Sequence, residues 1–275
     1  ATVTITNNGT LTLNKTSSSK TLAITNTSSE TSARALTNAS DKTATLEKNA
    51  TLSFNNTTTA ARYVIENTGT LNVNGATINN TVSNTASYNR GILNNSAGKI
   101  NMPSGTVYVN GVGIYSSGTS TSTTTPAVSI SGTLAETTIT STNGYAVYNY
   151  STGLIAITGG TITSTNSEGI RNRTTGIITL GTNEETPSVS TTVPSVTGAT
   201  IGVKIESAGT FNFYDGVIVG QSGSGTAIDG TVAAVPTGYG INKTVATLNN
   251  VTTETAILIT GYNYEEVDDY DDLIS

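Results

Sequence analysis

Apolar residues recur at every second position within a background of threonine, serine and asparagine. Residues 9–13 (Gly-Thr-Leu-Thr-Leu) show this pattern, and residues 69–73 (Gly-Thr-Leu-Asn-Val) repeat it. Similar segments begin at Gly98, Gly153, Gly176 and Gly209. Alternation with period two places one apolar face inward and one polar face outward, and threonine, valine and isoleucine favour strands. The pattern therefore predicts an all-β chain whose strands are separated by turns rich in glycine and asparagine.

The predicted strands follow one another as copies of a single unit. Corresponding apolar positions fall at Leu71, Ile100, Val128, Ile155, Ile178 and Phe211, in steps of 29, 28, 27, 23 and 33 residues. A second strand follows most of these positions, as 105–109 follows Ile100. A third strand precedes most of them, as 113–115 precedes Val128. Three short strands per repeat predict one coil of a solenoid, which buries its apolar face only by stacking on its neighbours.

These motifs resemble a known architecture. The Gly-Thr-Leu and Gly-Thr-Ile strands, together with Phe-Asn-Phe-Tyr-Asp-Gly at 211–216, resemble the right-handed parallel β-helix of the pectate-lyase-like kind. In particular they resemble the repeat regions of large bacterial surface and adhesin-like proteins, over roughly residues 1–220. At a mean repeat of 28 residues, the 275-residue chain would form about ten coils. An antiparallel β-sandwich is the alternative, since its strands alternate too.

The regular pattern weakens toward the C-terminus. We therefore expect β-helix coils over residues 1–219, terminal coils or a cap over 220–264, and an acidic tail or linker over 265–275. Exposed strand edges at the end of a solenoid invite pairing, so a cap there is useful.

Composition removes several functional classes. The chain has no Cys and no His, which excludes Ser-His-Asp and Cys-His triads and thiolate metal sites. With 12 Lys+Arg against 18 Asp+Glu it is mildly acidic, so nucleic acid is not expected as a partner. No apolar run reaches the length of a membrane helix, so we expect no membrane insertion. The chain starts at Ala1 without Met, which suggests a mature, processed chain or a fragment of a longer one. From the resemblance to surface proteins we expect an extracellular or cell-surface location.

A carbohydrate-active enzyme is the main functional alternative. Many β-helices of the resembled kind cleave polysaccharides as lyases or glycoside hydrolases, and such chemistry requires clustered carboxylates. The sequence has no Asp between Asp41 and Asp215. Glu66 and Glu206 occupy similar places in their coils but lie about five coils apart. We therefore expect no catalytic residues, no cofactor and no metal site.

Two features could mediate contacts with partners. Tyr145, Tyr148 and Tyr150 form a cluster that could stack on a glycan or contact a host-surface ligand, or could instead fill turns. Thr2, Val3, Thr4, Ile5 and Thr6 form a strand-like N-terminus that could pair end to end with another chain and build a fibre. The sequence thus predicts a non-enzymatic structural or adhesive surface protein.

Overall fold

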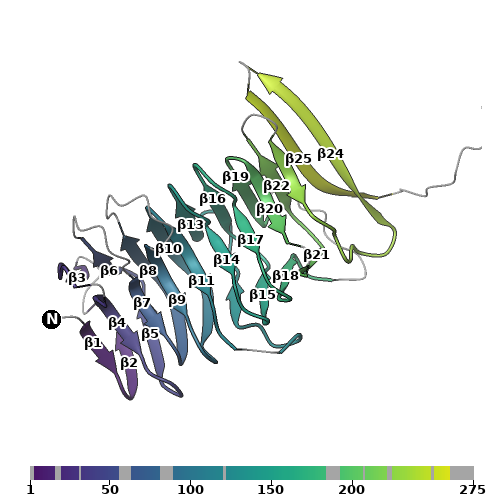
Figure 1. Ribbon diagram of the computed structural model, residues 1–275. Helices are drawn as coiled ribbons and strands as arrows, with labels where there is room; N and C mark the ends of the chain where they lie inside the picture. The colour runs from purple at the N-terminus through teal and green to yellow at the C-terminus, as the bar shows by residue number, and fades with distance from the viewer. Residues whose placement is uncertain are drawn as a thin grey trace, which may run out of the picture.

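The described part of the chain is all β. A computed structural model describes residues 3–15, 20–30, 32–55, 63–80, 89–119, 122–183, 193–206, 208–221, 225–248 and 251–260. It contains 25 strands and no helix within these residues. Neighbouring strands in space are distant in sequence, and the strands stack along one axis from the N-terminus toward the C-terminal end (Figure 1).

The first sheet has nine strands, all paired in parallel. Each strand lies beside one that is two or three elements away along the chain, so the chain completes a turn before it returns to this sheet. In order they are β1 (Val3–Asn7), β4 (Arg34–Asn38), β7 (Tyr63–Asn67), β9 (Arg90–Asn94), β11 (Val112–Ser116), β14 (Val147–Asn149), β17 (Ile170–Asn172), β20 (Ile201–Ile205) and β23 (Thr226–Asp229).

The second sheet contains two further rows of parallel strands. We call the first sheet the first row, and these two the second and third rows in the order given. One row holds β2 (Thr10–Leu13), β5 (Thr43–Glu47), the starts of β8 (Thr70–Asn80) and β10 (Lys99–Val109), β12 (Val128–Ile130), β15 (Leu154–Ile157), β18 (Ile177–Leu180) and β21 (Thr210–Phe213). The other holds β3 (Leu22–Asn26), β6 (Ala50–Phe54), the ends of β8 and β10, β13 (Thr137–Ser141), β16 (Thr161–Ser164), β19 (Ser195–Gly198) and β22 (Val217–Gly220).

This arrangement confirms the prediction of an all-β chain with stacked parallel strands, and it is consistent with a β-helix. Parallel pairing throughout the three rows contradicts the sandwich alternative, whose sheets are antiparallel. The first sheet has nine strands and each of the other two rows has eight, whereas about ten coils were expected. In two turns, β8 and β10 run through a corner as one long strand, where two short strands were expected.

Glycines shape this corner between the second and third rows. Gly75 (φ 92°), Gly105 (φ 128°) and Gly216 (φ 110°) adopt conformations that side chains disfavour. Asn49 (φ 68°) stands at the same corner in an earlier turn, and asparagine tolerates the left-handed region better than most residues do. The corner therefore recurs as a backbone feature along the stack.

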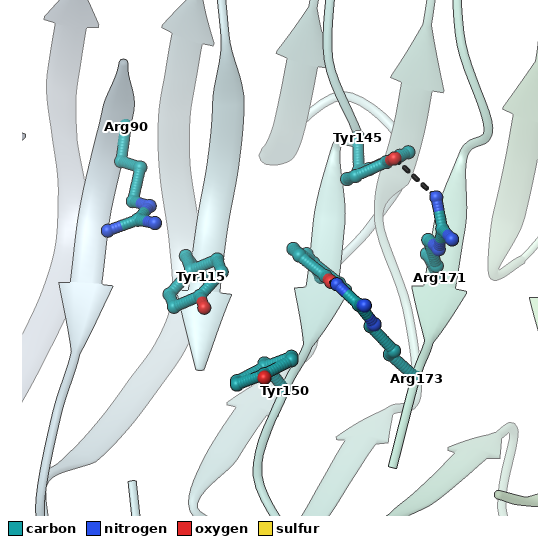
Figure 2. A pocket seen from close by; sticks show the side chains of 7 residues that line it. Arg90, Tyr115, Tyr145, Tyr150, Arg171 and Arg173 are labelled. Atoms are coloured by element: carbon teal, nitrogen blue, oxygen red, sulfur yellow. Dashed lines mark hydrogen bonds between the residues drawn. The ribbon is translucent and has the colours of Figure 1, made fainter. Parts of the chain in front are cut away.

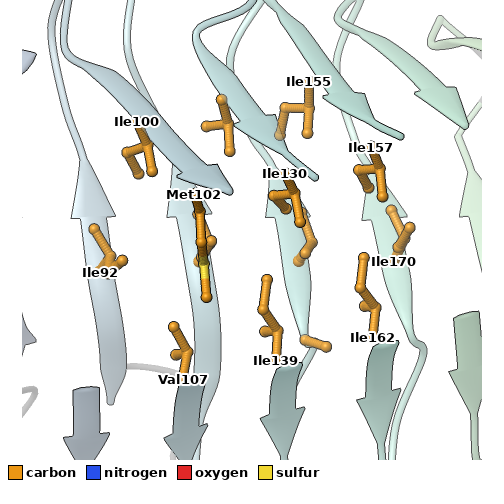
Figure 3. Close-up of a cluster of buried hydrophobic side chains, with 14 of the residues drawn as sticks. Ile92, Ile100, Met102, Val107, Ile130, Ile139, Ile155, Ile157, Ile162 and Ile170 are labelled. Carbon is orange, nitrogen blue, oxygen red and sulfur yellow. The ribbon is translucent and has the colours of Figure 1, made fainter. Parts of the chain in front are cut away.

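The interior is one continuous apolar core. Inward-facing apolar side chains of successive turns stack on one another, as Figure 3 shows for Met102, Ile130 and Ile157. Toward the C-terminal end the rings of Phe211 and Phe213 stack with centroids 6.0 Å apart. Dispersion contacts between like side chains in neighbouring turns hold the coils together.

A row of buried asparagines lines the end of the first sheet. Asn7, Asn38, Asn67 and Asn94 are aligned in register. Each Nδ2 donates to the Oδ1 of the next, at 2.7, 2.7 and 2.9 Å. The same position then holds Ser116, Asn149, Asn172 and finally Ile205. The amides also bond turn backbone, as Asn67 does with the carbonyl of Gly69, and so satisfy groups that the turn would leave unpaired.

A hairpin follows the last turn. β24 (Tyr239–Leu248) and β25 (Val251–Thr260) pair antiparallel, and β25 pairs antiparallel with β22. Ala256 and Leu258 are buried in the core. Figure 1 shows the hairpin extending past the stack at the C-terminal end. Residues 265–275, expected to be an acidic tail, lie outside the described residues.

Candidate functional site

The outer surface of the first sheet carries the described arginines and a group of tyrosines. Four of the five arginines lie in the described residues, and all four extend from this sheet or directly follow its strands: Arg34, Arg90, Arg171 and Arg173. Parallel pairing aligns the outward residues of successive strands into a row along the axis: Glu66, Leu93, Tyr115, Tyr148, Arg171, Lys204 and Asp229.

The predicted tyrosine cluster assembles on this surface. Tyr145 and Tyr148 meet edge to face at 4.9 Å, and Tyr148 and Tyr150 at 6.0 Å. Tyr115 from the preceding turn joins them, 5.1 Å from Tyr148 and nearly parallel to Tyr150 at 6.1 Å. Such ring pairs stabilise each other beyond their buried area. Tyr148 is buried, whereas Tyr150 keeps 43% of its surface exposed.

Arginines continue the tyrosine cluster toward the N-terminus. Tyr63 lies on the strand between those of Arg34 and Arg90, whose guanidinium carbons are 4.7 and 5.0 Å from its ring centroid. Arg90 is in turn 3.7 Å from the ring of Tyr115. Cation–π attraction favours both arrangements. Planar groups therefore follow one another along the sheet, from Arg34 to Tyr115.

On the other side, ion pairs fix two arginines. Arg171 bonds Glu206 (Nε–Oε1 2.9 Å) and the hydroxyl of Tyr145, and it lies 3.8 Å from Glu168. Arg173 lies 3.8 Å from Glu206 and donates to the Tyr148 hydroxyl at 3.3 Å. Arg171 and Arg173 thus bond tyrosines of the cluster, and Glu168 lies beside Arg171.

These side chains enclose a shallow pocket. It has a volume of about 340 Å³ and is lined by Arg90, Tyr115, Tyr145, Tyr148, Tyr150, Arg171 and Arg173. Figure 2 shows Arg90 and Tyr115 on one side and Arg171 and Arg173 on the other, with Tyr150 beside Tyr115. We call it the Tyr–Arg pocket. It offers aromatic faces, phenolic hydroxyls and cations, a combination suited to polar ligands with flat faces.

Two phenols of the pocket are held in the neutral form. Burial is the main cause that raises the pKa of Tyr115 above its usual value near 10, opposed by the positive charge of Arg90. Burial likewise raises the pKa of Tyr145, assisted by Glu168 and opposed by Arg171. Both hydroxyls therefore remain hydrogen-bonding groups without charge at neutral pH.

The N-terminal strand lies at an edge. Val3, Thr4, Ile5 and Thr6 belong to β1, whose one neighbour in the described sheet is β4; Thr2 lies outside the described residues. Ile5, Leu11, Leu22 and Ile24 are only partly buried at this end, whereas their partners one turn inward, Leu36, Ala44, Ala50 and Leu52, are fully buried.

The carboxylates of the described residues do not form a cluster. Glu66 pairs with Arg34, whereas Glu206 pairs with Arg171, several turns away. No group of three or more Asp and Glu that could hold a metal ion occurs in the described part of the chain.

Comparisons with known proteins do not supply a function. The chain matches no protein-family model, no curated protein and no solved structure. Within the described segments, no helix is long and apolar enough to cross a membrane.

Sequence reasoning identified Tyr145, Tyr148 and Tyr150 but missed the role of Arg34, Tyr63 and Arg90. A signal was present, because these three residues follow one another at steps of 29 and 27, each just before the inward-facing apolar residues of its strand. When the strands that carry these residues are aligned in register, the three planar side chains lie on one face of the sheet.

Proposed function

We propose that this protein is a non-enzymatic structural or adhesive protein of the cell surface or extracellular space. In this proposal it forms a right-handed parallel β-helix of the pectate-lyase-like kind, which displays the Tyr–Arg pocket as a contact site for a glycan or another host-surface ligand. The observation that carries the adhesive role is the gathering of four tyrosines and three arginines around one pocket. Aromatic and arginine side chains dominate the energetics of recognition surfaces.

The scaffold supports this role physically. A ligand site loses less entropy on binding when its side chains are already held in place. Tyr148 is buried, its hydroxyl accepts from Arg173, and Arg171 bonds both Tyr145 and Glu206. Much of the pocket is therefore ordered before any ligand arrives.

The proposal is tested by binding of the purified chain to an array of surface glycans. Tyr150→Ala should weaken binding by about fivefold or more, because loss of an aromatic residue at the centre of a contact costs above about 1 kcal/mol. Tyr108→Ala is the matched control, since Tyr108 is equally exposed (45%) but lies on β10, outside the first sheet. Equal loss in both variants, or none in Tyr150→Ala, would contradict the proposal.

A carbohydrate-active enzyme, either a polysaccharide lyase or a glycoside hydrolase, is the alternative. One observation favours it, namely that Glu168 and Glu206 both approach Arg171 at the rim of the pocket. Their oxygens are engaged in ion pairs, however, which does not suit a proton donor. Cleavage of glycans that bind the array, abolished by Glu206→Gln, would establish the enzyme instead.

A further inference from the structure

Arg90 differs from the other described arginines of this sheet, because no ion pair joins it to a carboxylate of the described residues. Arg34, Arg171 and Arg173 each contact a carboxylate. Among the described residues, no carboxylate lies within ion-pair distance of Arg90. The neighbouring segments 56–62 and 81–88 contain no Asp or Glu in their sequence. Within the described residues, the groups beside the Arg90 guanidinium are the aromatic rings of Tyr63 and Tyr115.

The hydrogen-bonding groups of Arg90 are also incompletely used. Its Nε is buried and has no acceptor within the described structure. A guanidinium presents five donors, and a buried donor without a partner is costly. The rings of Tyr63 and Tyr115 hold the group in place, and Figure 2 shows it at the side of the Tyr–Arg pocket.

We infer that the Tyr–Arg pocket binds an acidic glycan, whose carboxylate pairs with Arg90 while a sugar ring packs against Tyr150. This inference rests on the proposed function and specifies the ligand. A carboxylate in the pocket would supply a charge partner for Arg90 and would accept charge-assisted hydrogen bonds from its guanidinium. The exposed ring of Tyr150 offers a flat surface to a sugar, and the neutral phenols of Tyr115 and Tyr145 can bond its hydroxyls.

The test measures binding of the full chain to hyaluronan, alginate and polysialic acid, and to the methyl ester of hyaluronan, by calorimetry at fixed ionic strength. At least one acidic polymer should bind, and esterification should abolish binding to hyaluronan if hyaluronan is bound. Arg90→Gln should raise the Kd roughly 10- to 100-fold, the range expected for loss of charged hydrogen bonds. Arg90→Lys should recover only part of the affinity, because an ammonium cannot bind bidentately.

Lys99→Gln removes the same charge from an exposed position of β10, outside the first sheet, and is the matched control. Equal weakening in Lys99→Gln and Arg90→Gln would mean non-specific electrostatic attraction and would overturn the inference. So would tight binding of dextran sulfate or of an Asp/Glu-rich peptide that exceeds binding of every carboxylated glycan, or no binding of any acidic polymer. If neutral glycans bind, and Tyr150→Ala but not Arg90→Gln weakens them, the proposed function stands and the acidic ligand is wrong. The melting temperature of each variant shows whether it is folded.

Discussion

At the scale of single residues, the buried asparagines stabilise the fold through hydrogen bonds between successive turns. Asn67 accepts from Asn38 and donates to Asn94, and its amide also bonds the carbonyls of Gly69 and Lys99. One side chain thus bonds residues of three successive turns. Such buried amides are favourable only while every partner is present.

Replacing Asn67 by alanine should therefore destabilise the protein by roughly 2–4 kcal/mol, since it leaves several buried groups unsatisfied. The shift of the urea unfolding midpoint measures this effect. Asn101→Ala is the control, because Asn101 donates to Asn72 on the exposed surface and should cost less than about 0.5 kcal/mol. Equal shifts in the two variants would show that the asparagine row has no special role.

The raised pKa values of Tyr115 and Tyr145 lead to a prediction of how the stability of the fold changes at alkaline pH. Folding raises the pKa of Tyr115 and Tyr145 above the usual value near 10, chiefly through burial. The folded chain then holds protons that the unfolded chain releases, so stability should be level below pH 10 and should fall as pH rises through the folded pKa values. Thermal melting between pH 8 and 11 follows this decline. Tyr115→Phe should make it shallower, and a parent profile that stays level above pH 10 would refute the assignment.

At the scale of elements, the corner between the second and third rows depends on backbone conformation. A Cβ at Gly216 would lie 2.3 Å from the carbonyl oxygen of Pro194, and its φ is 110°. At Gly75 the nearest atom is the Cβ of Lys48 at 3.2 Å, and asparagine already occupies the equivalent place at Asn49.

We expect Gly216→Ala to cost more than about 2 kcal/mol, because the clash with backbone adds to the unfavourable φ. Gly75→Asn should cost about 1 kcal/mol or less. Chemical denaturation of the two variants in parallel compares them directly. The reverse order of stability would mean that the corner tolerates side chains for a reason other than available space.

Prediction from sequence succeeded for the elements and failed for some of their connections. Alternation located strands such as 154–157 and 210–213, because it reports which face of a strand is buried. It could not reveal that β24 and β25 form an antiparallel hairpin, since alternation is the same for either pairing direction. The row of buried asparagines was likewise not predicted, because 29 asparagines are spread through the chain and only the register of the strands shows which of them align.

At the scale of the whole molecule, the two ends of the stack differ. β25 occupies the edge of β22 and buries Leu258 against the core, whereas β1, β2 and β3 leave apolar side chains partly exposed. The end-to-end pairing proposed for Thr2 to Thr6 would cover this surface. Unpaired strand edges are a common route of association.

If the chain self-associates, deletion of residues 1–6 should return it to monomers, as measured by sedimentation velocity and by electron microscopy at several concentrations. Leu248→Ser removes an exposed apolar residue from the hairpin at the opposite end and serves as the control. Filaments that persist in the deletion variant but disperse in Leu248→Ser would place the contact at the hairpin instead.

The asparagine row has a further consequence for how the chain finds its order. A stack of identical turns could slip by one whole repeat with every hydrogen bond re-formed, in the way that a uniform lattice is unchanged by translation. Ser116 and Ile205 interrupt the row. In the native alignment the bonds between asparagine side chains run without a break from Asn7 to Asn94, so a slip that brought Ser116 into this run would lose an amide–amide bond. The interruptions therefore make the turns distinguishable from one another and favour one alignment of a repetitive chain.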